Sequence, residues 1–147
     1  MYALNFVGSS HLTQRHGFPQ TLKRHFSQTN KSFQSSFSIQ EIRSCPGATF
    51  CYEQFLNSFV QTVHKQRIEK GFAGQVNIIV MGANDQRQIS ELSSDQIGGA
   101  ILEFRSKLDH LVEKLMSSDS MLVVLTPIIP DESTRIELST VIEDVVR

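Results

Sequence analysis

The feature that most constrains the fold is an alternation of short apolar runs with longer amphipathic stretches. Three runs, at residues 2–7, 76–81 and 121–125, are almost entirely apolar, and a glycine or a nearby proline follows each of them. Strands that are apolar on both faces are typical of a parallel sheet covered on both sides. Residues 37–42 mix apolar and polar side chains as a half-buried strand does. The sequence therefore predicts four strands.

Helical patterns separate these strands. Apolar residues recur at helical spacing within 49–70, 101–115 and 131–146, and the polar segment 17–36 predicts a loop or a weak helix. Strand and helix then alternate four times, which predicts an α/β protein with a flavodoxin-like doubly wound parallel sheet of strand order 2-1-3-4. We expect the apolar positions of 49–70 to belong to the core; these are Tyr52, Phe55, Phe59, Val60, Val63 and Ile68.

Size and composition favour a single domain over residues 1–147. With 147 residues, 39% of them hydrophobic, the chain can bury one core without disulfides or metal. Cys45 and Cys51 are too few for a disulfide framework or a zinc site, so we expect reduced thiols. The sequence has no apolar run of about 18 residues and no pattern of a signal peptide. These features predict a soluble, intracellular, cytoplasmic protein with no membrane contact.

Charge is distributed unevenly along the chain. Residues 1–75 contain 8 Lys/Arg against 3 Asp/Glu, whereas residues 76–147 contain 6 against 12. A basic stretch between Arg15 and Lys31, which includes Lys23 and Arg24, is a candidate surface for phosphates or for an acidic partner. Because no nucleic-acid-binding motif accompanies it, we expect at most weak binding of nucleic acid that falls as salt rises.

Polar or flexible residues follow three of the predicted strands. Ligands of open α/β sheets bind beyond the carboxyl ends of the strands, and Ser10, Gly47 and Asn84 all fall there. We therefore expect these three residues to lie in one pocket at that edge of the sheet.

The segments that carry these residues are Phe-Val-Gly-Ser-Ser-His-Leu at 6–12, Arg-Ser-Cys-Pro-Gly-Ala-Thr at 43–49 and Val-Met-Gly-Ala-Asn-Asp at 80–85. Their order and spacing resemble the first three blocks of SGNH (GDSL-like) hydrolases. Ser10 takes the place of the nucleophile, and Ser9 replaces the usual aspartate of the first block. Gly47 and Asn84 take the places of the oxyanion-hole residues in the second and third blocks.

The resemblance implies an SGNH hydrolase fold that acts on an acyl or acetyl ester, with no metal and no organic cofactor. Acyl transfer develops negative charge on the carbonyl oxygen. The backbone N–H groups of Ser10 and Gly47 and the side-chain amide of Asn84 would stabilise that charge, each by about 3 kcal/mol.

Each of these residues also has a purely structural interpretation. A serine after a strand often caps the following helix, which applies to Ser10. Gly47 beside Pro46 is the composition of an ordinary turn. The side chains of Asn84 and Asp85 could cap the next helix or bond their own backbone.

The fourth block of the family, Asp-x-x-His, is missing. A serine needs a general base, usually a histidine oriented by a carboxylate. His110 follows Asp109 directly, but both fall in a predicted helix, where we expect a solvated pair. His11 is adjacent to Ser10, and neighbouring side chains do not face each other. The remaining histidines are His16, His25 and His64.

Two explanations of the missing block lead to different functions. Truncation before the last strand and helix of the family predicts an ester hydrolase domain that is inactive as it stands. A degenerate relative would instead be a non-catalytic SGNH-like binding module for RNA or protein, and a plain structural domain is the third alternative. Pro46, Gly47 and Ala48 are also similar to the esterase-like domain of non-LTR retrotransposon first-frame proteins.

Overall fold

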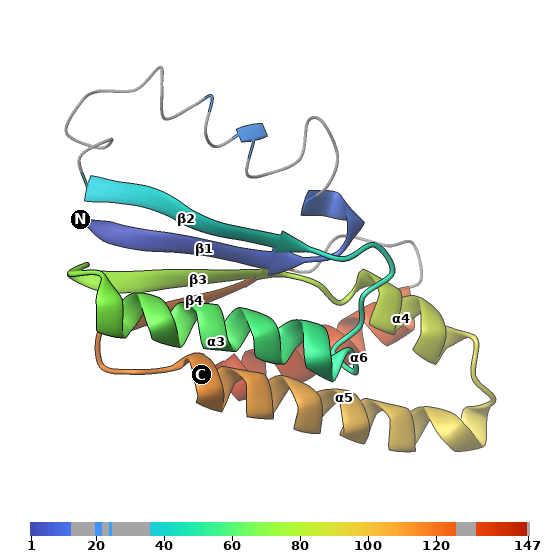
Figure 1. Ribbon diagram of the computed structural model, residues 1–147. Coiled ribbons are helices and arrows are strands. Elements are labelled where there is room, and N and C mark those ends of the chain that lie inside the picture. Colours follow the sequence, from blue (N-terminus) through green and yellow to red (C-terminus); the bar gives the residue numbers. More distant parts are fainter. Residues whose placement is uncertain (13–19, 22–23, 25–35, 126–131, 147) are drawn as a thin grey trace.

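The computed structural model contains a four-stranded parallel sheet, which confirms the predicted fold class and strand order. The strands are β1 (Tyr2–Gly8), β2 (Phe37–Ser44), β3 (Gly74–Val80) and β4 (Ser120–Leu125), in the order β2-β1-β3-β4 (Figure 1). The structure describes residues 1–12, 20–21, 24, 36–125 and 132–146. The segment 17–36, for which we predicted a loop or weak helix, lies largely outside these residues.

Four α-helices and one short 3-10 turn that lie wholly within the described part of the chain accompany the sheet. They are η1 (Ser10–Leu12), α3 (Glu53–Glu69), α4 (Ala83–Ser90), α5 (Ser94–Leu115) and α6 (Glu132–Val146). Apolar residues of α3, α5 and α6 form one buried cluster with Val7 and Ile79 of the sheet. A smaller cluster on the opposite face includes Leu4, Phe6 and Ile78. Successive residues of β1 and β3 thus pack into two apolar clusters, one on each face of the sheet.

The helices differ from the predicted ranges in three places. Helix α3 begins at Glu53 because residues 49–52 form a turn closed by Tyr52 N–H donating to Thr49 C=O at 3.1 Å. The prediction that Tyr52 and Ile68 belong to the core is wrong, since these residues are 42% and 86% exposed. Helix α4 was not predicted because its sequence is mostly polar, and α5 begins at Ser94 rather than near residue 101.

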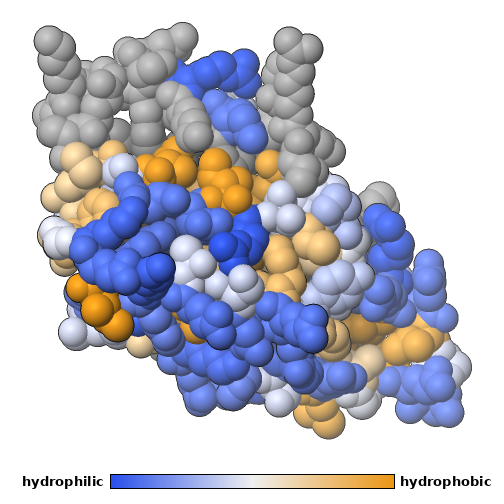
Figure 2. Space-filling model, in the orientation of Figure 1, coloured by the Kyte–Doolittle hydropathy of each residue, from blue (hydrophilic) through white to orange (hydrophobic). Residues whose placement is uncertain are grey.

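The outer surface of the helix layer is polar. Figure 2 shows that hydrophilic residues cover most of the molecule over α3 and α5 in this view. No helix in the described part of the chain is both long and apolar enough to cross a membrane.

Three neighbouring strands end at one level. Gly8, the last residue of β1, pairs with Ser44 of β2 and Val80 of β3. The pairing continues one residue further, because Cys45 N–H donates to Gly8 C=O at 3.0 Å and Ser9 N–H donates to Val80 C=O at 3.3 Å. The turns that follow these strands therefore start from a common edge of the sheet, which we call the carboxyl edge.

Candidate active site at the carboxyl edge

Ser10 begins η1, directly after β1, and is half-buried. The turn that presents it requires glycine at position 8, because a Cβ atom there would lie 2.5 Å from the Val80 carbonyl oxygen and 2.9 Å from Leu12 Cδ1. Ser9, which replaces the family's usual aspartate, is buried with 1% exposure. The close approach of β1 and β3 thus fixes the backbone that leads into Ser10.

Gly47 lies in the turn between β2 and α3. Its φ of 80° is in the left-handed region, which favours glycine. The next residue closes the turn, since Ala48 N–H donates to Cys45 C=O at 3.1 Å. Among the hydrogen bonds between described residues, none uses the Gly47 N–H. The turn therefore presents a backbone donor at the carboxyl edge.

Asn84 lies in the first turn of α4 and reaches across to the Gly47 turn. Its side-chain Nδ2 donates to Ala48 C=O at 3.1 Å, and the same amide has a second N–H. The structure therefore brings Asn84 and the Gly47 turn together. The alternative of local capping is not observed, since no side-chain hydrogen bond caps the start of α4.

Asp85 is a buried acid that the sequence did not single out as a site residue. Its side chain is 6% exposed, and Oδ1 accepts a hydrogen bond from Phe50 N–H at 3.1 Å. Burial disfavours the charged form and raises the pKa of Asp85 to about 6. The second oxygen, Oδ2, is buried without a partner among the described residues.

A pocket of about 190 Å³ lies beside Asp85. Its other lining residues come from the segment before α3, from α4 and α5, and from the connection between these two helices: Thr49, Cys51, Gln88, Ile89, Leu92, Ala100, Glu103 and Phe104. Ser10, Gly47 and Asn84 do not line this pocket. Ser10, Gly47 and Asn84 all follow strands that end at the carboxyl edge, as expected from the sequence. A pocket shared by all three stays a prediction.

Both cysteines are free thiols, as predicted. The Cys51 thiol donates a long hydrogen bond of 3.7 Å to Glu103 Oε1. Partial burial and the negative charges of Glu103 and Asp85 raise the pKa of Cys51. A raised thiol pKa lowers the thiolate fraction, so Cys51 is poorly suited to act as a nucleophile.

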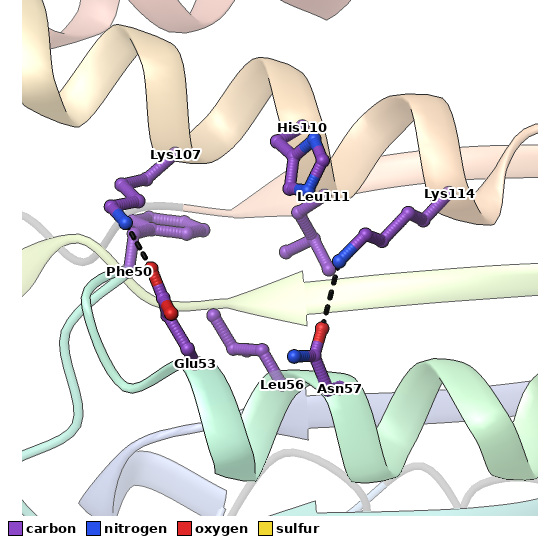
Figure 3. Close-up of a pocket in the computed structure, with 8 residues that line it drawn as sticks. All are labelled: Phe50, Glu53, Leu56, Asn57, Lys107, His110, Leu111 and Lys114. Atoms are coloured by element: carbon purple, nitrogen blue, oxygen red, sulfur yellow. Dashed lines mark hydrogen bonds and ion pairs between the residues drawn. The ribbon is translucent and has the colours of Figure 1, made fainter.

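His64 and His110 both belong to the helix layer. His64 Nε2 lies 2.7 Å from the Lys114 carbonyl oxygen, and His110 lines a groove of about 170 Å³ between α3 and α5 (Figure 3). In that groove Lys107 pairs with Glu53. His16 and His25 lie outside the described residues, as does the side chain of His11. Among the described side chains, the structure thus identifies no general base for Ser10.

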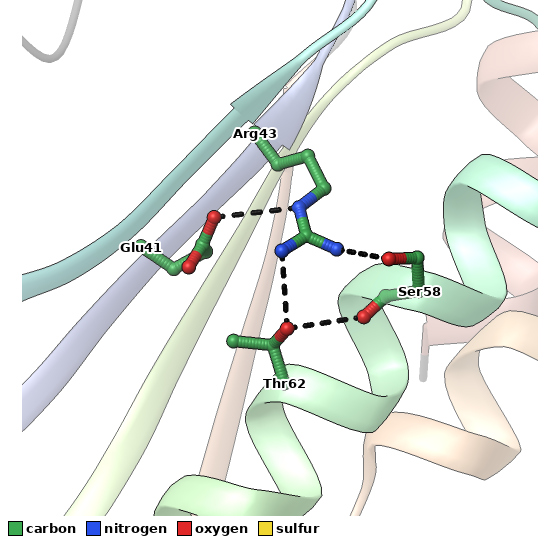
Figure 4. Close-up of polar contacts among 4 residues, drawn as sticks. All are labelled: Glu41, Arg43, Ser58 and Thr62. Carbon is green, nitrogen blue, oxygen red and sulfur yellow. Dashed lines mark hydrogen bonds and ion pairs between the residues drawn. The ribbon is translucent and has the colours of Figure 1, made fainter.

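Arg43 anchors the end of β2 to α3 (Figure 4). Its guanidinium donates to Glu41 Oε1 at 3.3 Å, to Ser58 Oγ at 2.5 Å and to Thr62 Oγ1 at 3.1 Å. The side chain precedes the Gly47 turn by four positions, so these contacts hold the strand from which the turn emerges. Sequence reasoning missed this role because the partners lie 15 and 19 residues away.

The basic stretch between Arg15 and Lys31 is described only in part. Of its basic residues, Arg24 alone lies among the described residues, and it is exposed. The structure therefore gives no test of the predicted weak binding to nucleic acid.

Comparison with known proteins finds likeness at the level of fold. The chain matches no protein-family model and no curated protein sequence. It does superpose on the crystal structure of protein YxiM from Bacillus subtilis, with a TM-score of 0.61 and 12% sequence identity over 97% of this chain. This chain covers 41% of the length of YxiM. At this identity the likeness establishes a shared α/β fold with a parallel sheet.

Proposed function

We propose that this chain is an SGNH-type ester hydrolase domain that contains the nucleophile and the oxyanion hole. Ser10 is the nucleophile, and the Gly47 N–H and the Asn84 amide are oxyanion donors. The observation that supports the proposal is the Asn84 bond to Ala48 C=O, the residue after Gly47, whose N–H has no hydrogen-bond partner among the described residues. Both donors belong to the edge at which β1 delivers Ser10.

The chemistry follows from these donors. Attack of a hydroxyl on an acyl or acetyl ester moves negative charge onto the carbonyl oxygen, and two pre-aimed neutral donors stabilise that charge. The serine hydroxyl must also lose its proton to a general base. The chain contains no Asp-x-x-His, so we expect Ser10 to remain protonated at neutral pH and to give no Ser10-dependent turnover as the chain stands.

An oxyanion hole without a base has a recognisable kinetic signature. In a serine hydrolase whose triad is removed, the oxyanion hole and substrate binding still accelerate hydrolysis by about 10³–10⁴ over water. This chain should therefore accelerate hydrolysis of an activated ester weakly. That acceleration should not depend on Ser10, but it should depend on Asn84.

The test is the rate of p-nitrophenyl acetate hydrolysis by the wild type, Ser10→Ala and Asn84→Ala, with Asn57→Ala as a control on the exposed side of α3. We expect Ser10→Ala and Asn57→Ala to match the wild type. Asn84→Ala should lose at least about tenfold of the protein-dependent rate, since one lost oxyanion donor typically costs about 10²–10³. An unchanged rate in Asn84→Ala would contradict the oxyanion hole, and a clear loss in Ser10→Ala would reveal an unidentified base.

Two finer assignments are part of the proposal. The similarity of Pro46, Gly47 and Ala48 to retrotransposon first-frame proteins suggests membership of that group of esterase-like domains. The alternative function, an SGNH-like module that binds RNA or protein without catalysis, depends on the basic stretch between Arg15 and Lys31. No contact among the described residues favours that alternative over the hydrolase.

A further inference from the structure

Asp85 occupies an unusual position for a carboxylate. It is the one acidic side chain among the described residues that is buried, and no cation pairs with it. Burying a carboxylate is costly unless it accepts strong hydrogen bonds. It accepts hydrogen bonds from its own backbone N–H and from Phe50 N–H, which lies 35 residues away in the sequence. Asp85 thus connects the start of α4 to the segment that follows the Gly47 turn.

Asn84 and Asp85 hold that segment from two points. Asn84 donates to Ala48 C=O, and Asp85 accepts from Phe50 N–H, each at 3.1 Å. The Phe50 ring is itself fixed, because it is 1% exposed and packs edge-on against Phe104 with ring centroids 5.3 Å apart. Residues 48–50 are therefore held through two backbone groups, Ala48 C=O and Phe50 N–H, and through the Phe50 ring. Gly47 directly precedes this segment.

We propose that Asp85 is a positioning residue for the oxyanion hole: by holding Phe50 it fixes the turn that points the Gly47 N–H toward the substrate oxygen. The inference rests on the proposed function, because it assigns Gly47 the role of an oxyanion donor. Asp85 itself does not touch the reacting atoms. It acts through the backbone of residues 47–50, in parallel with the Asn84 side chain.

The groups around Asp85 favour a test by titration. The pocket beside it contains Cys51 from the segment before α3 and Glu103 from α5, and Lys107 of α5 interacts electrostatically with both. Among the described residues of α6, which also packs against α4, none lines this pocket. Protonation of Asp85 weakens it as an acceptor, since a neutral acid binds an N–H less strongly than a carboxylate does. Gly47 should therefore sense the Asp85 titration.

The experiment compares wild type, Asp85→Asn, Asp85→Leu and Asp95→Asn by following the backbone amides of the ¹⁵N-labelled chain from pH 4 to 8. Asn keeps an acceptor oxygen without the charge, and Leu removes the acceptor. Asp95 is an exposed acid in the first turn of α5 and serves as the matched control. In the wild type and in Asp95→Asn, we expect the Phe50 and Gly47 resonances to shift together with a midpoint near pH 6.

Asp85→Asn should abolish this shared titration and keep the Gly47 resonance near its high-pH position, whereas Asp85→Leu should displace Gly47 at every pH. The Asn84-dependent rate on p-nitrophenyl acetate should survive in Asp85→Asn and fall at least about tenfold in Asp85→Leu. A Gly47 resonance that does not titrate, or that titrates unchanged in Asp85→Asn, would overturn the positioning role. If Gly47 responds as expected but no Asn84-dependent rate exists, the proposed function fails and the mechanical link between Asp85 and the turn stands.

Discussion

The two edges of the sheet use polar residues in different ways. At the amino edge, Arg67 donates to Gln75 Oε1 at 2.5 Å and to Ser120 Oγ at 2.7 Å, while Gln75 donates to Val63 C=O at 2.9 Å. These bonds join α3, β3 and β4 to one another. At the carboxyl edge, Asn84 bonds to Ala48 C=O and Asp85 bonds to Phe50 N–H, while the Gly47 N–H stays unpaired among the described residues.

This difference between the two edges indicates that one contributes mainly to stability and the other to ligand binding. Polar groups that bond each other across elements fix the packing and leave few donors for a ligand. Polar groups that fix a turn while a donor beside them stays unpaired form a preorganised binding site. The amino edge is of the first kind and the carboxyl edge is of the second. Variants at the two edges should therefore have separable effects.

The largest expected effects come from a matched pair of glycines. A Cβ atom at Gly8 would lie 2.5 Å from Val80 C=O, and one at Gly74 would lie 2.5 Å from Asp119 C=O. Gly8→Ala and Gly74→Ala should each lower the free energy of unfolding by about 2–3 kcal/mol, because backbone must move in both. Gly71→Ala is the control, since nothing lies within 4 Å of its Cβ position.

Urea denaturation measures the stability of these variants, and amide spectra show where each disturbance spreads. Gly8→Ala should displace the Gly47 and Asn84 resonances, whereas Gly74→Ala should leave them in place. Equal displacement by both variants would mean that the two edges are mechanically coupled, contrary to the comparison drawn above.

The pH dependence of the free energy of unfolding should show the cost of burying the ionised Asp85 carboxylate. Its pKa is 3.8 in an unperturbed chain and about 6 in the fold, so the folded protein holds a proton that the unfolded chain has released. Its contribution to stability is therefore full below pH 4 and falls as pH rises toward 6, by about 3 kcal/mol at most. Asp85→Asn should lack this fall and be more stable than the wild type at pH 7.

Urea denaturation between pH 4 and pH 7 measures this difference. Asp95 has a pKa lowered by the Ser93 hydroxyl, so its contribution has the opposite sign and is lost as pH falls. Asp95→Asn should leave the Asp85-dependent fall unchanged. If the stability of Asp85→Asn followed that of the wild type across this range, the burial cost assigned to Asp85 would be wrong.

A smaller effect is expected from the amino-edge network. Arg67→Met keeps the aliphatic stem but removes the donors to Gln75, Ser120 and the Leu115 carbonyl oxygen, which should cost about 1–2 kcal/mol. Arg105→Met is the matched control, because its 3.6 Å pair with Asp144 is about half exposed and such pairs contribute less than about 1 kcal/mol. Thermal unfolding should rank the two variants in this order. A change of ester hydrolysis in Arg67→Met would contradict the separation of the two edges.

The sheet could be predicted from the sequence because its strands have a strong local signature. Apolar runs such as 76–81 and the glycines after them indicate buried strands that end in turns, and the order of elements restricts the topology. The helices were harder to predict from the sequence. Polar residues conceal α4, and Gly98 and Gly99 lie inside α5, where glycine disfavours helix and tertiary packing decides the outcome.

The candidate site could be predicted only as a set of positions. Ser10, Gly47 and Asn84 follow strands, and sheet topology alone brings them to one edge. The long-range hydrogen bonds that organise the edge were not predictable, because Asn84 and Asp85 bond residues 36 and 35 positions away in the sequence. Residue type suggested local bonds for both. Asn84 makes a tertiary contact instead, whereas Asp85 bonds its own backbone N–H as well as that of Phe50.

The most direct test of the contrast between the edges is a titration of the ¹⁵N-labelled chain with methylphosphonate, a small tetrahedral anion that mimics the oxyanion. We expect saturable shifts of the Gly47 amide and the Asn84 side-chain amide, with the Gln75 side-chain amide and the Ser120 amide unmoved. Asn84→Ala should abolish the shift of Gly47. Shifts centred on Gln75 and Ser120, or a Gly47 amide that does not respond, would contradict the assignment of the binding site to the carboxyl edge.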